Sequence, residues 1–238
     1  MLERSSLGSA DIHVWTIDLD RPPRLASVCS DDELARAARL VRERDRCGFL
    51  STRGALRVLI GRYCGANPAA LRFKVGAWGK PALDGSLDPP IEFNVSHSGA
   101  TALIALARER AVGVDVETVR PMAEGLGITR RMFGAEPHDL LARLEPTERT
   151  RAFFRLWTAH EACVKALGAA LASAAATLRM DFNDADPVCT WVDPAVAPHG
   201  LALAPLEVGP GRVASIAWRR RGSMVEDAAR IASFSFAE

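Results

Sequence analysis

The sequence lacks the paired cysteines that would indicate a disulfide framework or a zinc site. Its five cysteines are an odd number, they are widely spaced, and no two form a CxxC motif. This use of cysteine fits a reducing compartment. No apolar run approaches the length of a membrane span, and residues 1–15 contain no apolar signal core. We therefore expect a cytoplasmic protein without membrane association.

The sequence also lacks an excess of charge of either sign. It has 30 Lys and Arg residues against 29 Asp and Glu residues, so nucleic-acid binding as the main role has no support and any basic site must be local. No GxxxxGK[ST] loop is present, which argues against a P-loop nucleotide hydrolase. What remains is an ordinary globular composition, 48% apolar over 238 residues, enough for one large domain or two small ones.

Periodicity predicts a mixture of strands and helices without an obvious internal sequence repeat. Strands are expected over 11–19, 71–75, 101–107, 112–117, 178–182, 189–192, 201–208 and 212–218, with a final short strand around 231–236. Helices are expected over 31–40, 49–64 and 153–168. The segment 123–144 is expected to be helical, with breaks at Gly134 and Pro137.

We further expect the strands at 101–107 and 112–117 to form an antiparallel hairpin. The short polar segment between them reads as a turn. Such a hairpin would bring the residues before the first strand, Ser96 and His97, near the end of the second strand.

The helix expected over 153–168 carries charges in an unusual place. Trp157, Glu161, Lys165 and Gly168 are spaced four, four and three residues apart, so they share one stripe. One interpretation is an ordinary Glu–Lys pair at the edge of a core helix, worth only ~0.3–0.5 kcal/mol. The other is a functional pair on the same stripe as a tryptophan, and this helix alone does not decide between the two.

The strand expected over 112–117 places two carboxylates on one face. Gly113, Asp115 and Glu117 alternate with valines that point the other way. Neighbouring carboxylates repel each other unless a cation or hydrogen-bond donors lie between them, although exposed strand carboxylates are also common. The glycine leaves space for a ligand to approach the backbone. With Glu161, the pair could form an all-oxygen site of the kind that suits Mg²⁺.

These two segments together resemble a known pair of motifs. Gly113-Val-Asp115-Val-Glu117, followed about forty residues later by Trp157-Thr-Ala-His-Glu161-Ala-Cys-Val-Lys165, is similar to the signature of 4′-phosphopantetheinyl transferases of the larger, Sfp-type class. Gly79-Lys80-Pro81, the run FNVSHS at 93–98 and FGAE at 133–136 match further segments of that family. The resemblance implies an α+β fold of two similar α/β halves, near 1–110 and 111–238, packed as a pseudo-dimer with the site at their cleft.

The resemblance also implies the reaction. A holo-[acyl-carrier-protein] synthase of this kind moves 4′-phosphopantetheine from coenzyme A to a serine of an apo acyl or peptidyl carrier protein and releases adenosine 3′,5′-bisphosphate. Mg²⁺ would be bound by Asp115, Glu117 and Glu161. Glu161 would take the serine proton, directly or through a water, and Lys165 would bind the leaving diphosphate.

Coenzyme A needs a cationic pocket of its own. The resemblance implies that Lys80, Ser96 and His97 contact the coenzyme, and that Arg44 in the arginine-rich run 36–46 contacts its 3′-phosphate. His160 stands where the family usually has lysine, so a phosphate contact there would depend on pH. The second glycine of the family's Gly-x-Gly-Leu is also absent after Gly168.

The carrier would present an acidic helix, for which Arg130, Arg131 and Met132 are candidate docking residues. Fatty-acid, polyketide and peptide synthetase carriers all fit, and we expect a monomer. Two other classes stay open: a non-catalytic coenzyme A-binding sensor, which would not need three carboxylates and a lysine, and an unrelated Mg²⁺-dependent nucleotide hydrolase.

Overall fold

The chain forms two compact units, which meet in the sequence between Glu109 and Arg110. The computed structural model describes residues 7–22, 24–76, 81–85, 90–168, 178–183, 186–195, 197–221 and 229–236. Unit 1 comprises Met1–Glu109 together with Ala229–Glu238, and unit 2 comprises Arg110–Ala228. The division lies beside the predicted boundary, but the last strand of the chain returns to unit 1 instead of staying with 111–238.

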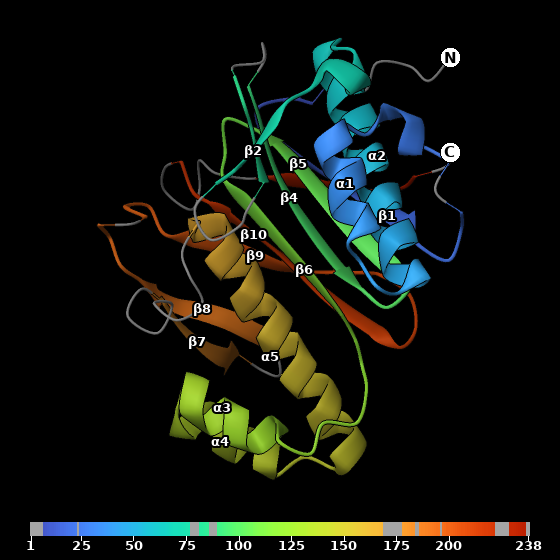
Figure 1. Cartoon of the computed structure of the whole chain (residues 1–238). Helices are drawn as coiled ribbons and strands as arrows, with labels where there is room; N and C mark the ends of the chain where they lie inside the picture. Colours follow the sequence, from blue (N-terminus) through green and yellow to red (C-terminus); the bar gives the residue numbers. More distant parts are fainter. Residues whose placement is uncertain are drawn as a thin grey trace. The chain divides into compact units, whose positions relative to one another are not determined.

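Unit 1 is built on a four-stranded sheet in the order β11-β1-β5-β4 (Figure 1). β5 pairs antiparallel with both β1 and β4, whereas β11 adds in parallel to the outer edge of β1. The short strands β2 and β3 form a separate antiparallel pair. Its elements are β1 (Asp11–Asp18), η1 (Ala26–Val28), α1 (Asp31–Ala38), α2 (Glu43–Cys64), η2 (Pro68–Ala70), β2 (Phe73–Val75), β3 (Pro81–Leu83), β4 (Ile91–Ser98), β5 (Thr101–Arg108) and β11 (Arg230–Ser235).

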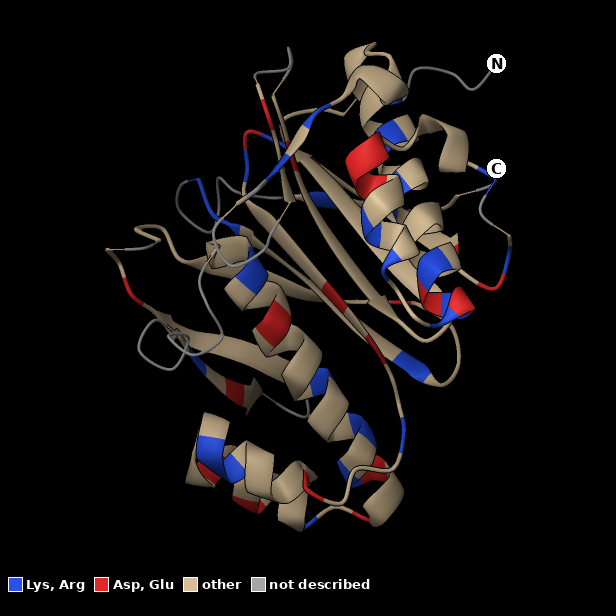
Figure 2. Cartoon of the chain, in the orientation of Figure 1, with Lys and Arg blue, Asp and Glu red and all other residues tan. Residues whose placement is uncertain are grey.

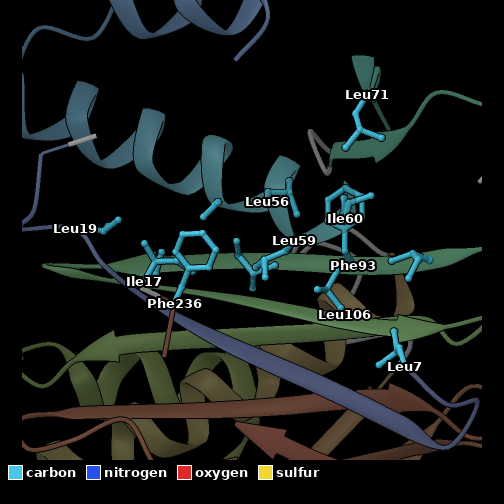
Figure 3. Close-up of a cluster of buried hydrophobic side chains, with 14 residues drawn as sticks. Leu7, Ile17, Leu19, Leu56, Leu59, Ile60, Leu71, Phe93, Leu106 and Phe236 are labelled. Atoms are coloured by element: carbon cyan, nitrogen blue, oxygen red, sulfur yellow. The ribbon is translucent and has the colours of Figure 1, made fainter. Parts of the chain in front are cut away.

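The core of unit 1 lies between α2 and this sheet. Leu56, Leu59 and Ile60 recur at helical spacing and point from α2 towards the strands, as Figure 3 shows. They meet alternate residues of the sheet, among them Phe93 and Leu106, and each of the five is at most 4% exposed. This apolar contact fixes the rotation of α2 about its axis. It therefore also determines which side chains in the first turns of the helix face β4.

A buried ion pair joins α1 to α2. Ser30 and Glu33 form a capping box at the start of α1, and the same Glu33 accepts a 2.7 Å hydrogen bond from Arg57 Nε. Arg57 is 1% exposed and also donates to the carbonyl oxygens of Pro68 and Leu71, each at 2.9 Å. One guanidinium therefore holds α1, α2 and the segment that leads into β2.

Unit 2 has a three-stranded antiparallel sheet in the order β6-β10-β9 and a separate antiparallel pair, β7-β8. The helix α5 packs along β6 and β10. It starts with Pro146 at its first turn and ends at Gly168, whose φ of 66° is left-handed. The elements are β6 (Val112–Thr118), α3 (Gly125–Phe133), α4 (Ala135–Ala142), α5 (Pro146–Leu167), β7 (Leu178–Asn183), β8 (Asp186–Val192), β9 (Leu201–Leu206) and β10 (Arg212–Arg219).

The two units repeat one topology. In each, the first strand pairs with the last of three strands, which pairs with the one before it: β1-β5-β4 in unit 1 and β6-β10-β9 in unit 2. Each also has a 22-residue helix between its first and second sheet strands, α2 or α5, and each helix ends at a left-handed glycine, Gly65 or Gly168. The expected α+β fold of two similar halves is therefore confirmed.

The expected hairpin between 101–107 and 112–117 is wrong. The chain turns at Gly99, which has a φ of 58°, so that β5 pairs with the preceding strand β4. β6 pairs with β10 in unit 2. Glu109, at the junction of β5 and β6, has a φ of 51°. Strand periodicity shows that a segment is extended but does not identify its partner, so the convergence of His97 and Asp115 inferred from that hairpin loses its basis.

The run FNVSHS lies entirely within strand β4. Two other expectations need correction. Pro137 lies inside the first turn of α4, where its missing N–H costs nothing, and only Gly134 breaks the helical segment. α2 starts at Glu43 instead of 49. Over the parts of the chain that the structure describes, no helix is long and apolar enough to span a membrane.

Candidate functional site

The centre of unit 2 is the contact between α5 and β6, where the two backbones meet at Gly113. A Cβ added to Gly113 would lie 2.1 Å from the carbonyl oxygen of Ala162 and 2.4 Å from the backbone nitrogen of Ala166. The space beside this glycine is therefore filled by α5, and the expectation that it admits a ligand is wrong. The glycine instead lets the helix approach close enough to place Lys165 over the strand.

Lys165 and Asp115 form a direct ion pair at this contact. The lysine Nζ lies 2.7 Å from Asp115 Oδ1 and donates a second hydrogen bond, of 3.2 Å, to the carbonyl oxygen of Val114. The Asp115 side chain is 8% exposed and that of Lys165 is 26% exposed. The predicted α5 stripe and the predicted acidic strand face therefore do meet, and Figure 2 shows acidic positions on both β6 and α5.

Glu161 lies one helical turn before Lys165 and shares its surroundings. Burial raises the pKa of Glu161; the neighbouring charges of Asp115 and Glu117 add to the increase, while Lys165 opposes it. Glu161 Oε1 is buried and has no hydrogen-bond partner among the residues that the structure describes. A buried carboxylate oxygen of this kind calls for a proton, a donor or a cation.

Glu117 lies further along β6, at its more exposed end. Its Oε2 accepts a 3.2 Å bond from Arg120, three residues on, and its side chain is 23% exposed. In the described part of the chain, no three His, Cys, Asp or Glu side chains are gathered tightly enough to hold a metal as they stand. Asp115 and Glu117 are close enough to raise the pKa of Glu161. The three carboxylates therefore lie near one another but are not arranged as metal ligands.

The residue types fit an oxygen-ligated divalent cation such as Mg²⁺. Asp115, Glu117 and Glu161 supply hard carboxylate oxygens, and the buried Glu161 oxygen is one whose hydrogen-bonding capacity is unfilled in the described structure. Magnesium needs only one or two carboxylates, since waters and substrate phosphates complete its shell. Asp115 and Glu161 would thus be sufficient, with Glu117 able to contribute from the edge.

His160 faces away from this group. Its ring is 3% exposed and packs edge-on against Phe133 with 5.1 Å between the ring centroids. Burial lowers the pKa of His160 to about 4, so the ring is neutral near pH 7. This placement gives no support to the expected phosphate contact, because a buried neutral imidazole offers no cation.

A second candidate site is a cavity of about 660 Å³ within unit 1. It lies beside α1, the first turns of α2 and the end of β4, and both Arg44 and His97 line it. Arg36, Arg42 and Arg53 also line it, whereas Asp45 is the one carboxylate among its described lining residues. Arg44 reaches Asp20 at 3.3 Å, an exposed pair that a bound anion could readily replace.

One of the residues expected to bind the coenzyme, Ser96, is not among the described residues that line this cavity. Strand alternation points Val95 and His97 towards it, which leaves Ser96 on the other face of β4, 7% exposed. Lys80 lies outside the described residues.

Sequence reasoning missed Arg53, which lies outside the arginine-rich run 36–46. The Arg53 side chain is 14% exposed, and its guanidinium carbon lies 5.7 Å from the Phe49 ring centroid and 5.5 Å from that of Phe73. The available signal was spacing, since Phe49 and Arg53 are four apart on α2 and so lie on one face of the helix.

Another missed pair lies behind the carboxylates. Ser215 on β10 stands directly opposite Asp115 in the antiparallel register, so both side chains face α5. Its hydroxyl lies 3.2 Å from that of the fully buried Thr158 on α5. This buried pair places hydroxyl groups, which can donate and accept hydrogen bonds, beside Asp115. Sequence reasoning missed it because strand periodicity alone does not show that β10 pairs with β6.

Comparisons with known proteins agree with both halves of this description. A family model described as the 4′-phosphopantetheinyl transferase superfamily matches residues 111–199, and one described as 4′-phosphopantetheinyl transferase, N-terminal, matches residues 15–109. The 4′-phosphopantetheinyl transferase HetI of Nostoc sp. is 37% identical over 210 residues, which cover 86% of this chain and 85% of HetI. A 4′-phosphopantetheinyl transferase of Bacillus subtilis is 29% identical over 168 residues, 66% of this chain and 71% of that protein. The chain therefore belongs to the 4′-phosphopantetheinyl transferase superfamily.

Proposed function

We propose that this protein transfers 4′-phosphopantetheine from coenzyme A to a serine of an apo carrier protein and releases adenosine 3′,5′-bisphosphate. The observation that carries the proposal is the group formed by Asp115, Glu161 and Lys165 where α5 crosses β6, in a chain of this superfamily. We also propose a cytoplasmic location, which the use of cysteine fits, and a monomeric state, since the chain already contains two similar halves.

The chemistry is one phosphoryl transfer. The serine oxygen attacks the phosphorus of the coenzyme A diphosphate that carries the pantetheine, a P–O bond forms, and the P–O bond to the adenosine bisphosphate breaks. Mg²⁺ held by Asp115 and Glu161, with Glu117 at the edge, would neutralise the diphosphate charge and orient its oxygens. The protein must also remove the serine proton and supply a cation to the leaving group.

Glu161 is the proposed base, directly or through a water. Burial and two neighbouring carboxylates raise its pKa, which makes it a better proton acceptor than an exposed glutamate. Lys165, one turn further along α5, is the proposed cation for the leaving 5′-phosphate of adenosine 3′,5′-bisphosphate. Its present contact with Asp115 means that the ammonium must leave the carboxylate, or be shared with it, when the coenzyme binds.

We further propose that the cavity of unit 1 takes the 3′-phosphate of coenzyme A. Arg44 and His97 were expected there, and Arg36, Arg42 and Arg53 add positive charge that a phosphate would neutralise. Ser96, Lys80 and His160 are not used in this proposal, since two of them lie elsewhere and Lys80 lies outside the described structure.

The test is intact-mass spectrometry of an apo carrier protein incubated with this protein, coenzyme A and Mg²⁺. The expected result is a mass gain of one phosphopantetheine group on the carrier, matched by release of adenosine 3′,5′-bisphosphate and abolished by a chelator. Fatty-acid, polyketide and peptide synthetase carriers should each be tried. No gain on any of them, with coenzyme A still bound by calorimetry, would contradict catalysis and leave a coenzyme A-binding protein.

A further inference from the structure

Lys165 is held against the acidic strand instead of extending from its helix. Its Nζ contacts Asp115 Oδ1 at 2.7 Å and the Val114 carbonyl oxygen at 3.2 Å, and both acceptors belong to β6. The close approach of α5 at Gly113 makes this possible, since a Cβ there would lie 2.9 Å from Lys165 Cβ. The ammonium thus lies where a metal cation bound by Asp115 would also have to lie.

The charges around Lys165 explain why it is held there. Asp115, Glu117 and Glu161 place three carboxylates around one region, and Arg120 pairs with the outermost, Glu117. Asp115 is the most deeply buried of the three, and leaving its charge without a counter-ion would cost much of the stability of unit 2. Lys165 supplies that counter-ion from within the chain.

Resting on the proposed function, we propose that Lys165 is the resident counter-ion of the metal-free site, and that a divalent cation competes with it for Asp115. Cation binding then releases the ammonium, which becomes available to the diphosphate of coenzyme A. Metal and coenzyme therefore bind cooperatively, because each prefers the state in which Lys165 has left the strand. A lysine that merely oriented Asp115 would stay in place and would strengthen metal binding.

The first test is binding of Mn²⁺ alone, without coenzyme A, followed by the electron paramagnetic resonance signal of the free ion. Lys165→Met removes the charge and keeps most of the side-chain volume, Lys165→Arg keeps the charge, and Lys74→Met changes an exposed lysine of unit 1. We expect Lys165→Met to bind Mn²⁺ at least about fivefold more tightly than the wild type. The two other variants should match the wild type.

The second test observes the wild-type protein, in which Lys165 is one of three lysines, beside Lys74 and Lys80. In protein labelled with ¹³C at lysine Cε, saturating Mg²⁺ should shift the Lys165 resonance and leave that of Lys74 in place. Lys74→Met and Lys80→Met assign two of the three signals, and the third is that of Lys165. This readout reports the ammonium in the wild-type fold, so it decides the proposal even where Lys165→Met folds poorly.

Unchanged or weaker Mn²⁺ binding by Lys165→Met, or a Lys165 resonance unmoved by Mg²⁺ that calorimetry shows to be bound, would overturn the counter-ion role. Neither result touches the proposed function, which the carrier assay decides separately. Absence of Mn²⁺ binding to every variant would overturn the counter-ion role, because that role requires a cation to bind Asp115 without coenzyme A. If Mg²⁺-dependent transfer to a carrier persisted in that case, the metal would have to be bound elsewhere or only together with coenzyme A.

Discussion

At the scale of single residues, one glycine determines whether the candidate site can form. Gly113 is the point at which α5 and β6 touch, and the atoms that a Cβ would meet there include two backbone atoms that cannot swing aside. Both the height of Lys165 over the strand and its 2.7 Å contact with Asp115 follow from this approach. The geometry of the site therefore depends on the absence of a side chain at Gly113 as much as on the charged side chains.

Gly113→Ala should destabilise the protein by about 3 kcal/mol and reduce transfer, because the helix must move away from the strand. Gly127→Ala is the matched control. Gly127 lies in α3 with open space where its Cβ would be, so the alanine should stabilise the protein by ~0.5–1 kcal/mol. Urea unfolding measures both, and equal effects of the two substitutions would contradict the close contact.

Arg44 allows the coenzyme pocket to be tested at the same scale. Arg44→Ala should raise the Michaelis constant for coenzyme A about tenfold, since a charge-assisted bond to phosphate is lost. With 3′-dephospho-coenzyme A, the variant and the wild type should be alike. Arg39→Ala, in the same run but absent from the described lining of the cavity, serves as the control. A loss that is independent of the 3′-phosphate would place that phosphate elsewhere.

At the scale of elements, the buried pair between α1 and α2 supports the wall of the cavity. Glu33→Gln leaves the buried Arg57 guanidinium without its carboxylate and weakens the cap of α1, so unfolding should become easier by about 3 kcal/mol. Asp20→Asn breaks the exposed pair with Arg44 and should change stability by less than ~0.5 kcal/mol. Chemical denaturation of both variants checks this, and a small effect of Glu33→Gln would mean that the pair is dispensable.

The last turn of α3 is the proposed docking surface for the carrier. Arg130 and Arg131 are both exposed there, while Met132 is half-buried, and Figure 2 shows basic positions on this helix. Reversing both charges to glutamate should raise the Michaelis constant for the carrier, whose docking helix we expect to be acidic, and leave that for coenzyme A unchanged. Steady-state kinetics with each substrate varied separately would show this, and an unchanged carrier constant would remove the surface from the account.

Periodicity predicted most elements because each carries its own signal, as the stripe of α5 and the alternation of β6 do. It failed where the information lies in another part of the chain. Nothing in 101–107 says that it pairs with β1 and β4 instead of β6, and nothing in the arginine run says which guanidiniums turn inwards. Helical spacing grouped Glu161 with Lys165, and the family resemblance supported placing both beside Asp115, whereas the role of Gly113 needed the structure.

At the scale of the whole molecule, the chain repeats one topology and then returns to its first unit. β11 adds to β1, where Phe234 stacks on Trp15 with 4.7 Å between ring centroids. His13 on β1 lies beside Phe234 and makes a 2.6 Å hydrogen bond with the Tyr63 hydroxyl at the end of α2. His13 thereby contacts both β11 and the end of α2.

Burial lowers the pKa of His13, which gives unit 1 a defined pH dependence. Below the ordinary histidine pKa of about 6.5, the unfolded chain takes up a proton that the folded chain resists, so stability is full above this pH and falls as the pH drops towards the lowered value. His13→Gln should reduce that loss, and His199→Gln, at an exposed histidine, should not. Thermal melting between pH 7.5 and 5 tests this, and parallel curves for the wild type and His13→Gln would refute it.

The most direct test of the whole account is the rate of carrier modification by Glu161→Gln. The substitution removes the proposed base and one metal ligand while keeping the size of the side chain. Glu124→Gln, at an exposed glutamate before α3, is the matched control. We predict that the phosphopantetheine mass gain falls at least about a hundredfold with Glu161→Gln and is unchanged with Glu124→Gln. Near wild-type modification by a folded Glu161→Gln would contradict the assignment of the active site to the contact between α5 and β6.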